Sequence, residues 1–159
     1  MNMVKKYNLP HDYLSQEKIP GFYPAKDEQH FFANSISTVE EPLLMEEQFN
    51  LSETKVLFDF LQFNQAEVAE VFEIDPSTLV RWKKEDKLLS RLLTKTIKDM
   101  DKIIAKGIRI FGNEVNFLNW MNTTNEALGN QKPIDLMRNP NGLEWIDQAL
   151  DALSWGNIF

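Results

Sequence analysis

Residues 106–137 decide how the rest of the chain is organised, and they read KGIRIFGNEVNFLNWMNTTNEALGNQKPIDLM. This stretch predicts three short helices in succession. Gly112 closes the first and Asn122 ends the second. Gly129 and Pro133 bracket a tight connection into the third, because proline in a first helical turn costs no hydrogen bond. Segments upstream lead into this unit, and segments downstream pack on it.

One more helix follows the unit. Residues 141–153 place apolar side chains on one helical face, at Leu143, Ile146, Leu150 and Leu153. The chain then ends in a segment that is too apolar for a terminus surrounded by water, Ser154-Trp155-Gly156-Asn157-Ile158-Phe159. Two alternatives are open for this segment: it folds back on the last helix, or it inserts into a partner.

The residues before the unit predict a long amphipathic helix. From Lys87 onward, apolar residues recur every three or four positions, at Leu89, Leu92, Leu93, Ile97, Met100, Ile103, Ile104, Ile108 and Phe111. Gly107 marks either a kink or a close crossing with another helix. The apolar stripe faces the protein's own core or serves a dimer, and the spacing leaves both open.

Further upstream, two short helices have the spacing of a helix-turn-helix. A helix over residues 53–63, capped by Ser52, precedes them. The pair covers residues 65–72 and 76–84, with Asp75 capping the second helix. Glu73 stands in the turn where many such motifs have glycine, so the turn must be reached without a residue that tolerates positive φ, which disfavours a standard turn but not the motif. The expected buried positions are Val68, Ala69, Ile74, Leu79 and Trp82. A plain three-helix cluster is the alternative.

The second helix of this pair carries polar and basic residues that suit DNA. Residues 81–109 hold ten Lys and Arg against four Asp and Glu, a net charge of +6, whereas the remaining segments are acidic. Side chains at the helix start are expected to contact base edges or phosphates, and the lysines to contact phosphates. The predicted DNA-binding residues are Ser77, Thr78, Arg81, Lys83, Lys84 and Lys87. Because such motifs read two half-sites, we predict a homodimer. A solvated basic face is the alternative.

Composition narrows the functional classes. A hydrophobic content of 43% with 26% charged residues is ordinary for a globular chain. No apolar run is long enough for a membrane span or a signal peptide, so we predict a cytoplasmic protein without a membrane partner. The absence of cysteine excludes disulfides and cysteine-based zinc sites or nucleophiles. The net charge of −7 argues against a protein that simply coats nucleic acid.

Catalysis finds little support in the residues. The two histidines, His11 and His30, lie in an N-terminal arm that Pro10, Pro20, Pro24 and Pro42 interrupt, where a general base would be poorly held. There is no glycine-rich phosphate loop, and the carboxylates show no metal-ligand grouping. We therefore predict no enzyme, with no catalytic residue, no metal and no cofactor.

Several spaced residues carry a resemblance to a known family. In chain order they are Ile110 to Gly112, Trp120 with Met121, Asn125 to Gly129, Pro133 to Met137, and Gly142. This pattern resembles the toxin-binding domain of the Xre/MbcA/ParS antitoxins over roughly residues 100–159. Thr124 departs from it, since the family has proline there. The predicted fold is all-α, with an irregular arm (residues 1–51), a helix-turn-helix domain (52–99) with a long connecting helix, and a toxin-binding domain (100–159).

The resemblance implies a function. Antitoxins of this family pair with RES-domain toxins that consume NAD, and their C-terminal end covers the toxin's NAD-binding cleft. Carried onto this chain, the toxin-binding residues are Ser154, Trp155, Gly156, Asn157, Ile158 and Phe159. The same reading predicts repression of the chain's own operon, better with toxin bound. The alternatives are a stand-alone DNA-binding regulator whose C-terminal unit only dimerises, and a helical adaptor without a DNA role.

Overall fold

The computed structural model of the chain describes residues 47–156, and these residues are mainly helical. This part contains no β-strand, only the isolated bridges Asn50–Leu88 and Asn125–Gln131. The predicted all-α fold is therefore confirmed. In chain order the elements are η2 (Leu51–Thr54), α2 (Lys55–Leu61), α3 (Gln65–Val71), α4 (Pro76–Glu85), α5 (Arg91–Phe111), α6 (Glu114–Met121), η3 (Glu126–Leu128), α7 (Pro133–Leu136) and α8 (Pro140–Ser154).

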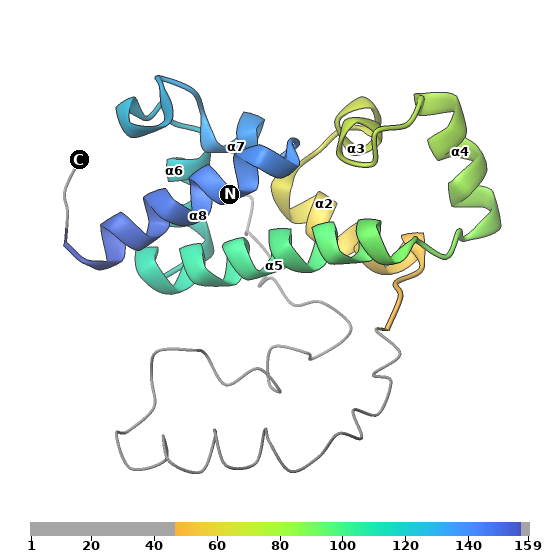
Figure 1. Cartoon of the computed structure of the whole chain (residues 1–159), viewed down its shortest axis with the longest axis horizontal. Helices are drawn as coiled ribbons and strands as arrows, with labels where there is room; N and C mark the ends of the chain where they lie inside the picture. Colours follow the sequence, from red (N-terminus) through yellow and green to blue (C-terminus); the bar gives the residue numbers. More distant parts are fainter. Residues whose placement is uncertain (1–46, 157–159) are drawn as a thin grey trace, which may run out of the picture. The chain divides into compact units, whose positions relative to one another are not determined.

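The long helix α5 connects the other helices. Figure 1 shows α3 and α4 near the N-terminal end of α5, and α6 and α8 along its C-terminal half. The boundary predicted between residues 99 and 100 falls inside α5, which is continuous. Both predicted regions thus share this helix, and the division into two domains stays a prediction. Of the predicted arm, only residues 47–51 are described.

The first described helix begins differently from the prediction. Asn50, not Ser52, precedes the first turn, and its backbone N–H donates to the Glu53 carboxylate at 2.7 Å. Ser52 instead donates its backbone N–H and its hydroxyl to the two carboxylate oxygens of Asp86, at 2.9 and 3.0 Å. The predicted helix over residues 53–63 is split into η2 and α2, and α2 ends at Leu61. The hydrogen bonds to Asp86, which lies 34 residues further along the chain, outweigh the local preference of Ser52 for a helix cap.

The turn between α3 and α4 has a standard shape although it lacks glycine. Glu73 takes a left-handed backbone conformation with φ of 54°. Its N–H donates to the Glu70 carbonyl at 3.0 Å, and the Ile74 N–H donates to the Ala69 carbonyl at 3.0 Å. This is the Schellman pattern that normally ends in glycine. The expectation that Glu73 disfavours a standard turn is therefore wrong, because Glu73 itself adopts the positive φ.

The expected core of the α3–α4 pair is present with two changes. Val68, Ala69 and Leu79 are buried as predicted. Ile74 and Trp82 are only half-buried, because they lie at the edge of the pair. The Trp82 ring packs on Phe72, with 6.1 Å between the ring centroids. Apolar contacts therefore hold α3 and α4 together.

The long helix starts later than predicted, at Arg91 instead of Lys87. Leu89 is buried but lies in an extended segment, where its N–H donates to the Phe49 carbonyl at 2.8 Å. Ser90 then caps α5 by accepting a hydrogen bond from the Leu93 N–H at 3.2 Å. Leu92 departs from the predicted stripe, since 72% of it is exposed. Ile97, Met100, Ile103 and Ile104 are buried as the stripe requires.

Gly107 marks a close crossing of α5 with α6. A Cβ atom at this position would lie 2.1 Å from the ring of Phe117, which is fully buried. Of the two alternatives predicted for Gly107, a kink or a close crossing with another helix, the close crossing is the one present. Downstream, Gly112 ends α5 with φ of 82°, Asn122 follows α6, and Pro133 opens α7, as the sequence predicts.

Lys106 ties α5 to α8. Its Nζ atom donates to Asp147 Oδ1 at 2.7 Å and to Asp151 Oδ1 at 2.6 Å, and only 19% of its side chain is exposed. Burial lowers the pKa of Lys106, but hydrogen bonds and charge from both aspartates outweigh this effect and raise the pKa above the usual 10.5. Beside this contact, Ile146 and Leu150 of α8 are fully buried. The last helix is thus fixed by both packing and charge.

Candidate functional site

The C-terminal end of α8 exposes a large apolar side chain. Ser154 is the last residue of the helix, and its hydroxyl donates to the Asp151 carbonyl at 2.7 Å. Trp155 follows with 83% of its surface exposed, so it does not fold back on the helix. Gly156 has φ of 76°, a conformation that turns the chain away from the helical path. Asn157, Ile158 and Phe159, the other residues predicted to bind a partner, lie outside the described residues.

A groove of about 570 Å³ runs beside the same helix. One wall is α8, which contributes Trp145, Gln148, Ala149 and Ala152, and the other is the turn around η3. Trp145 is 51% exposed. Because positions 145, 148, 152 and 155 recur at three or four residues, the groove lies on the helical face that also leads to Trp155.

The opposite wall of the groove is a tightly bonded turn. The Asn125 side chain accepts a hydrogen bond from the Ala127 N–H at 2.9 Å. The Asn125 N–H donates to the Gln131 carbonyl at 3.1 Å, and the Asn130 N–H donates back to the Asn125 carbonyl at 2.9 Å. Gly129 and Asn130 both have positive φ, which closes the loop in few residues. Thr124, where the family pattern has proline, does not prevent this closure.

The predicted DNA-binding residues divide between faces of α4. Ser77, Arg81 and Lys84 are exposed and lie four and three residues apart, so they share one helical face. Among the described residues neither Arg81 nor Lys84 forms an ion pair. These three residues therefore form a compact polar and basic surface.

The other three predicted residues flank this surface. Thr78 is half-buried. Lys83 lies on another face of α4, where it lines a groove together with Asp59 and Asp86. Lys87 lies just beyond the helix end, is exposed, and its carbonyl accepts a hydrogen bond from the Leu51 N–H at 2.9 Å.

Sequence reasoning missed two notable residues. Trp145 had a signal, because it is a large apolar residue off the stripe formed by Leu143, Ile146 and Leu150. Arg138 had none, because its partners on α3 are some seventy residues away in the chain, as the hydrogen bond to Glu67 illustrates. A contact of that kind requires the folded structure.

The structure also bears on metal and membrane sites. In residues 47–156 no group of three His, Asp or Glu side chains is arranged to hold a metal ion. Among the helices that the structure describes, none combines the length and apolar character that a bilayer crossing requires. The two histidines of the chain lie outside the described residues.

A known protein family matches the part of the chain that contains this groove. Residues 106–156 match the antitoxin Xre/MbcA/ParS C-terminal toxin-binding domain. A crystal structure of the M. tuberculosis MbcT-MbcA toxin-antitoxin complex is similar over 64% of this chain and 90% of the matched chain, with 20% identity and a TM-score of 0.44. At this TM-score the likeness supports no conclusion about this chain. A comparison with curated proteins found no match.

Proposed function

Since residues 106–156 match the Xre/MbcA/ParS toxin-binding domain, we propose that this chain is an antitoxin of that family and neutralises a cognate RES-domain toxin that consumes NAD. It does so by covering the toxin's active site. The mechanism is stoichiometric binding, and no catalytic residue, metal or cofactor of this chain takes part. The chain also represses its own operon as a homodimer. Both activities belong to the cytoplasm, where NAD and the operon are found.

Trp155 is the observation that carries the toxin-binding part. It stands exposed at the end of the toxin-binding domain, and burying a large apolar side chain stabilises a complex by about 1.5–3 kcal/mol. Tryptophan is also among the residues that most often dominate binding energies. Gly156 allows a close approach of backbone to the partner, and Asn157, Ile158 and Phe159 extend the segment from Ser154 into the cleft.

The groove beside α8 supplies a second contact surface. Trp145 and Ala152 lie on the same helical face as Trp155, so one toxin surface can cover all three. The turn at Asn125–Gln131 is fixed by its own hydrogen bonds, and a pre-formed wall loses little entropy on binding. We propose that the toxin seats on this groove while the C-terminal segment enters its active site.

Co-expression with the cognate toxin tests the proposal. The variants are the full chain, a chain that ends at Leu153, and Trp145→Ala, and the measurement is cellular NAD. We expect the full chain to preserve NAD and the chain ending at Leu153 to fail, although circular dichroism shows it to be folded. Leu92→Ala is the matched control, because Leu92 is also largely exposed but lies outside residues 106–156.

The possible outcomes separate the two contact surfaces. If the shortened chain protects NAD as well as the full chain and Trp145→Ala does not, the groove alone occludes the toxin and the C-terminal segment is dispensable. If no form of the chain protects NAD, the chain does not neutralise a toxin of this class. The stand-alone regulator then becomes the better description of its function.

The exposed face of α4 supports the DNA-binding part. Ser77, Arg81 and Lys84 form the centre of the proposed contact, since the two cations have no ion pair within the described residues. Thr78, Lys83 and Lys87 flank it and complete the set. A homodimer would present two copies of this face to two half-sites of the operator.

Salt dependence tests the DNA contact. Each phosphate contact contributes about one unit to the slope of log affinity against log salt concentration. Replacing Arg81 and Lys84 together with alanine should therefore lower the slope by about two units. Lys95→Ala is the control, because Lys95 is also an exposed cation but lies on α5 and already pairs with Asp99 at 2.6 Å. An unchanged slope in the double variant would exclude α4 as the DNA-reading helix.

A further inference from the structure

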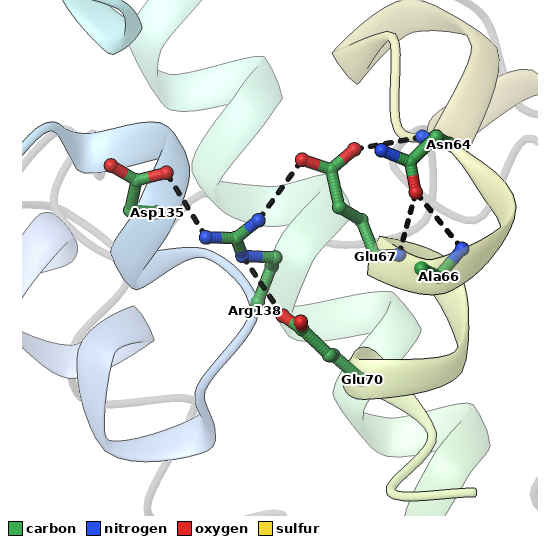
Figure 2. Close-up of polar contacts among 6 residues, drawn as sticks. All are labelled: Asn64, Ala66, Glu67, Glu70, Asp135 and Arg138. Atoms are coloured by element: carbon green, nitrogen blue, oxygen red, sulfur yellow. Dashed lines mark hydrogen bonds and ion pairs between the residues drawn. The ribbon is translucent and has the colours of Figure 1, made fainter. Parts of the chain in front are cut away.

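One arginine joins the toxin-binding domain to α3. The guanidinium of Arg138 contacts carboxylates from two elements, and we call Arg138, Glu67, Glu70 and Asp135 the Arg138 cluster. Nη1 lies 3.0 Å from Glu67, Nε lies 3.2 Å from Glu70, and Nη2 lies 3.1 Å from Asp135. Figure 2 shows that Glu67 and Glu70 come from α3, while Asp135 belongs to α7. Each nitrogen of the guanidinium therefore serves a different carboxylate.

Glu67 also accepts a hydrogen bond at the start of α3, as Figure 2 shows. While its Oε1 accepts from Arg138, its Oε2 accepts a hydrogen bond from the Asn64 N–H at 2.8 Å. The Asn64 side chain in turn accepts from the N–H groups of Ala66 and Glu67 at 2.9 and 3.0 Å. These bonds form the capping box that begins α3. The carboxylate that closes the first turn of α3 is thus held by the toxin-binding domain.

The main packing partners of the α3–α4 pair among the described residues lie outside α6, α7 and α8. Among the described residues, α3 packs mainly on α4, and α4 mainly on α3 and η2. The helices α6, α7 and α8 pack on α5 and on one another instead. The Arg138 cluster is therefore well placed to set the position of α3 relative to α7 and α8.

The position of Arg138 also connects it to the proposed toxin contact. Arg138 is followed by Asn139, the cap of α8, and Trp155 comes directly after the other end of that helix. Because α8 is one continuous helix, a displacement of its C-terminal end also moves its N-terminal end, next to Arg138. That shift changes the distance between Arg138 and the carboxylates on α3.

We infer that Arg138 is the positioning residue that couples toxin binding to DNA binding, through Glu67 and Glu70. This inference rests on the proposed function and adds its regulation. Toxin bound at the far end of α8 determines the position of Arg138. Arg138 in turn determines the position of the first turn of α3, and α3 determines the position of the DNA-reading helix α4.

The geometry requires arginine in this role. Three nitrogens in one plane reach three carboxylates, whereas a lysine ammonium is a single point of charge and cannot span them. The cluster also offers a matched pair of variants. Glu70→Gln removes a contact that crosses to α3 without touching the capping box, and Asp135→Asn removes only the contact that stays within the toxin-binding domain.

The experiment uses the full chain, the cognate toxin and a duplex carrying the promoter of its own operon. The measured quantity is the ratio of operator Kd without toxin to operator Kd with saturating toxin. For the wild-type chain and Asp135→Asn we expect a ratio of about five or more, as is typical of coupled sites. For Glu70→Gln and Arg138→Lys the ratio should fall below about two, while toxin affinity stays within about two-fold of wild type.

Hydrogen exchange gives a readout that does not depend on DNA. Toxin should change the exchange of the α3 backbone N–H groups in the wild-type chain and in Asp135→Asn, but not in Arg138→Lys. If Arg138→Lys and Glu70→Gln keep the wild-type Kd ratio and the wild-type exchange response, the inference is wrong while the proposed function stands. If the wild-type chain binds toxin but no operator DNA, the repressor part of the proposed function fails. If toxin also changes the hydrogen exchange of α3 equally in wild type and Arg138→Lys, the inference about Arg138 is wrong as well.

Discussion

Gly107 lies where the ring of Phe117 crosses α5, and the crossing leaves no room for a methyl group. A Cβ atom would approach the ring to 2.1 Å. We therefore expect Gly107→Ala to destabilise the protein by about 1–3 kcal/mol, as overpacking of a core usually does. Helix propensity alone predicts the opposite, a gain of about 1 kcal/mol. Urea unfolding measures which effect is larger.

A second substitution serves as the control for this prediction. Phe117→Leu shortens the side chain that meets the added methyl group, so the two changes together should cost less than their sum. Strict additivity of the two effects, or a stabilised Gly107→Ala protein, would contradict the close crossing.

Glu73 holds a left-handed conformation that costs a residue with a Cβ atom about 1–2 kcal/mol. Glu73→Gly removes most of that cost, although glycine gains entropy in the unfolded chain. We expect a net stabilisation of about 0.5–1 kcal/mol in thermal unfolding. Glu73→Ala is the control, because it removes the carboxylate but keeps the Cβ atom. Equal effects of alanine and glycine would show that charge, not backbone strain, matters at this position.

Local residue preferences predict some of these details and not others. Asp75 before Pro76 correctly marks the start of α4, although the Asp75 side chain forms no capping hydrogen bond, and Gly112 correctly marks the end of α5. Ser52 has an equally good cap sequence, yet it binds Asp86 instead. The prediction fails at Ser52 because Ser52 has a tertiary partner, and no residue near it in the sequence indicates that partner.

At the scale of elements, the Lys106 contact to Asp147 and Asp151 should stabilise the packing of α8 on α5. Lys106→Met keeps the aliphatic stem and removes the charge. Since both aspartates are about half exposed, we expect a loss of about 1 kcal/mol at neutral pH. Lys95→Met is the control, because the Lys95–Asp99 pair is solvent-exposed and should contribute about 0.5 kcal/mol or less.

The same contact has a definite pH dependence. The pKa of Lys106 is raised above 10.5 in the folded state, so the folded protein holds this proton more tightly than the unfolded chain. The stabilisation is fully present below about pH 10.5 and is lost as the pH rises through the folded pKa. The difference in unfolding free energy between wild type and Lys106→Met should therefore shrink only in that alkaline range. A difference that disappears already between about pH 7 and pH 9 would contradict the assignment.

Helical periodicity predicts the elements well and their ends less well. The stripe from Ile97 to Ile104 identifies α5, because burial follows its spacing. The predicted start at Lys87 is wrong, because Leu89 pairs with Phe49 in an extended segment instead of joining the helix. The spacing of Leu89 to Leu92 and Leu93 also fits a helix, so the apolar pattern alone cannot distinguish a helix from an extended segment at Leu89.

At the scale of the whole molecule, the sequence predicts the toxin-binding domain but not how it is connected to α3. The Gly, Trp and Pro positions between Ile110 and Gly142 identify the domain, and residues 106–156 match its family. Trp155 is exposed, and the toxin-binding role of residues 154–159 stays a prediction. Trp145 lies off the apolar stripe of α8 in the sequence, but the groove that it lines requires the fold. Arg138 has no sequence signal, because its role depends on a distant ion pair.

We propose that this chain inhibits its toxin by stoichiometric binding through the C-terminal end of α8. The most direct test is a titration of the purified toxin's NAD consumption with the purified full chain, at concentrations far above Kd. We expect the rate to fall linearly and to reach background at a fixed molar ratio, whereas a chain ending at Leu153 leaves most of the rate. A toxin that keeps its full rate in an excess of the folded full chain would contradict the claim.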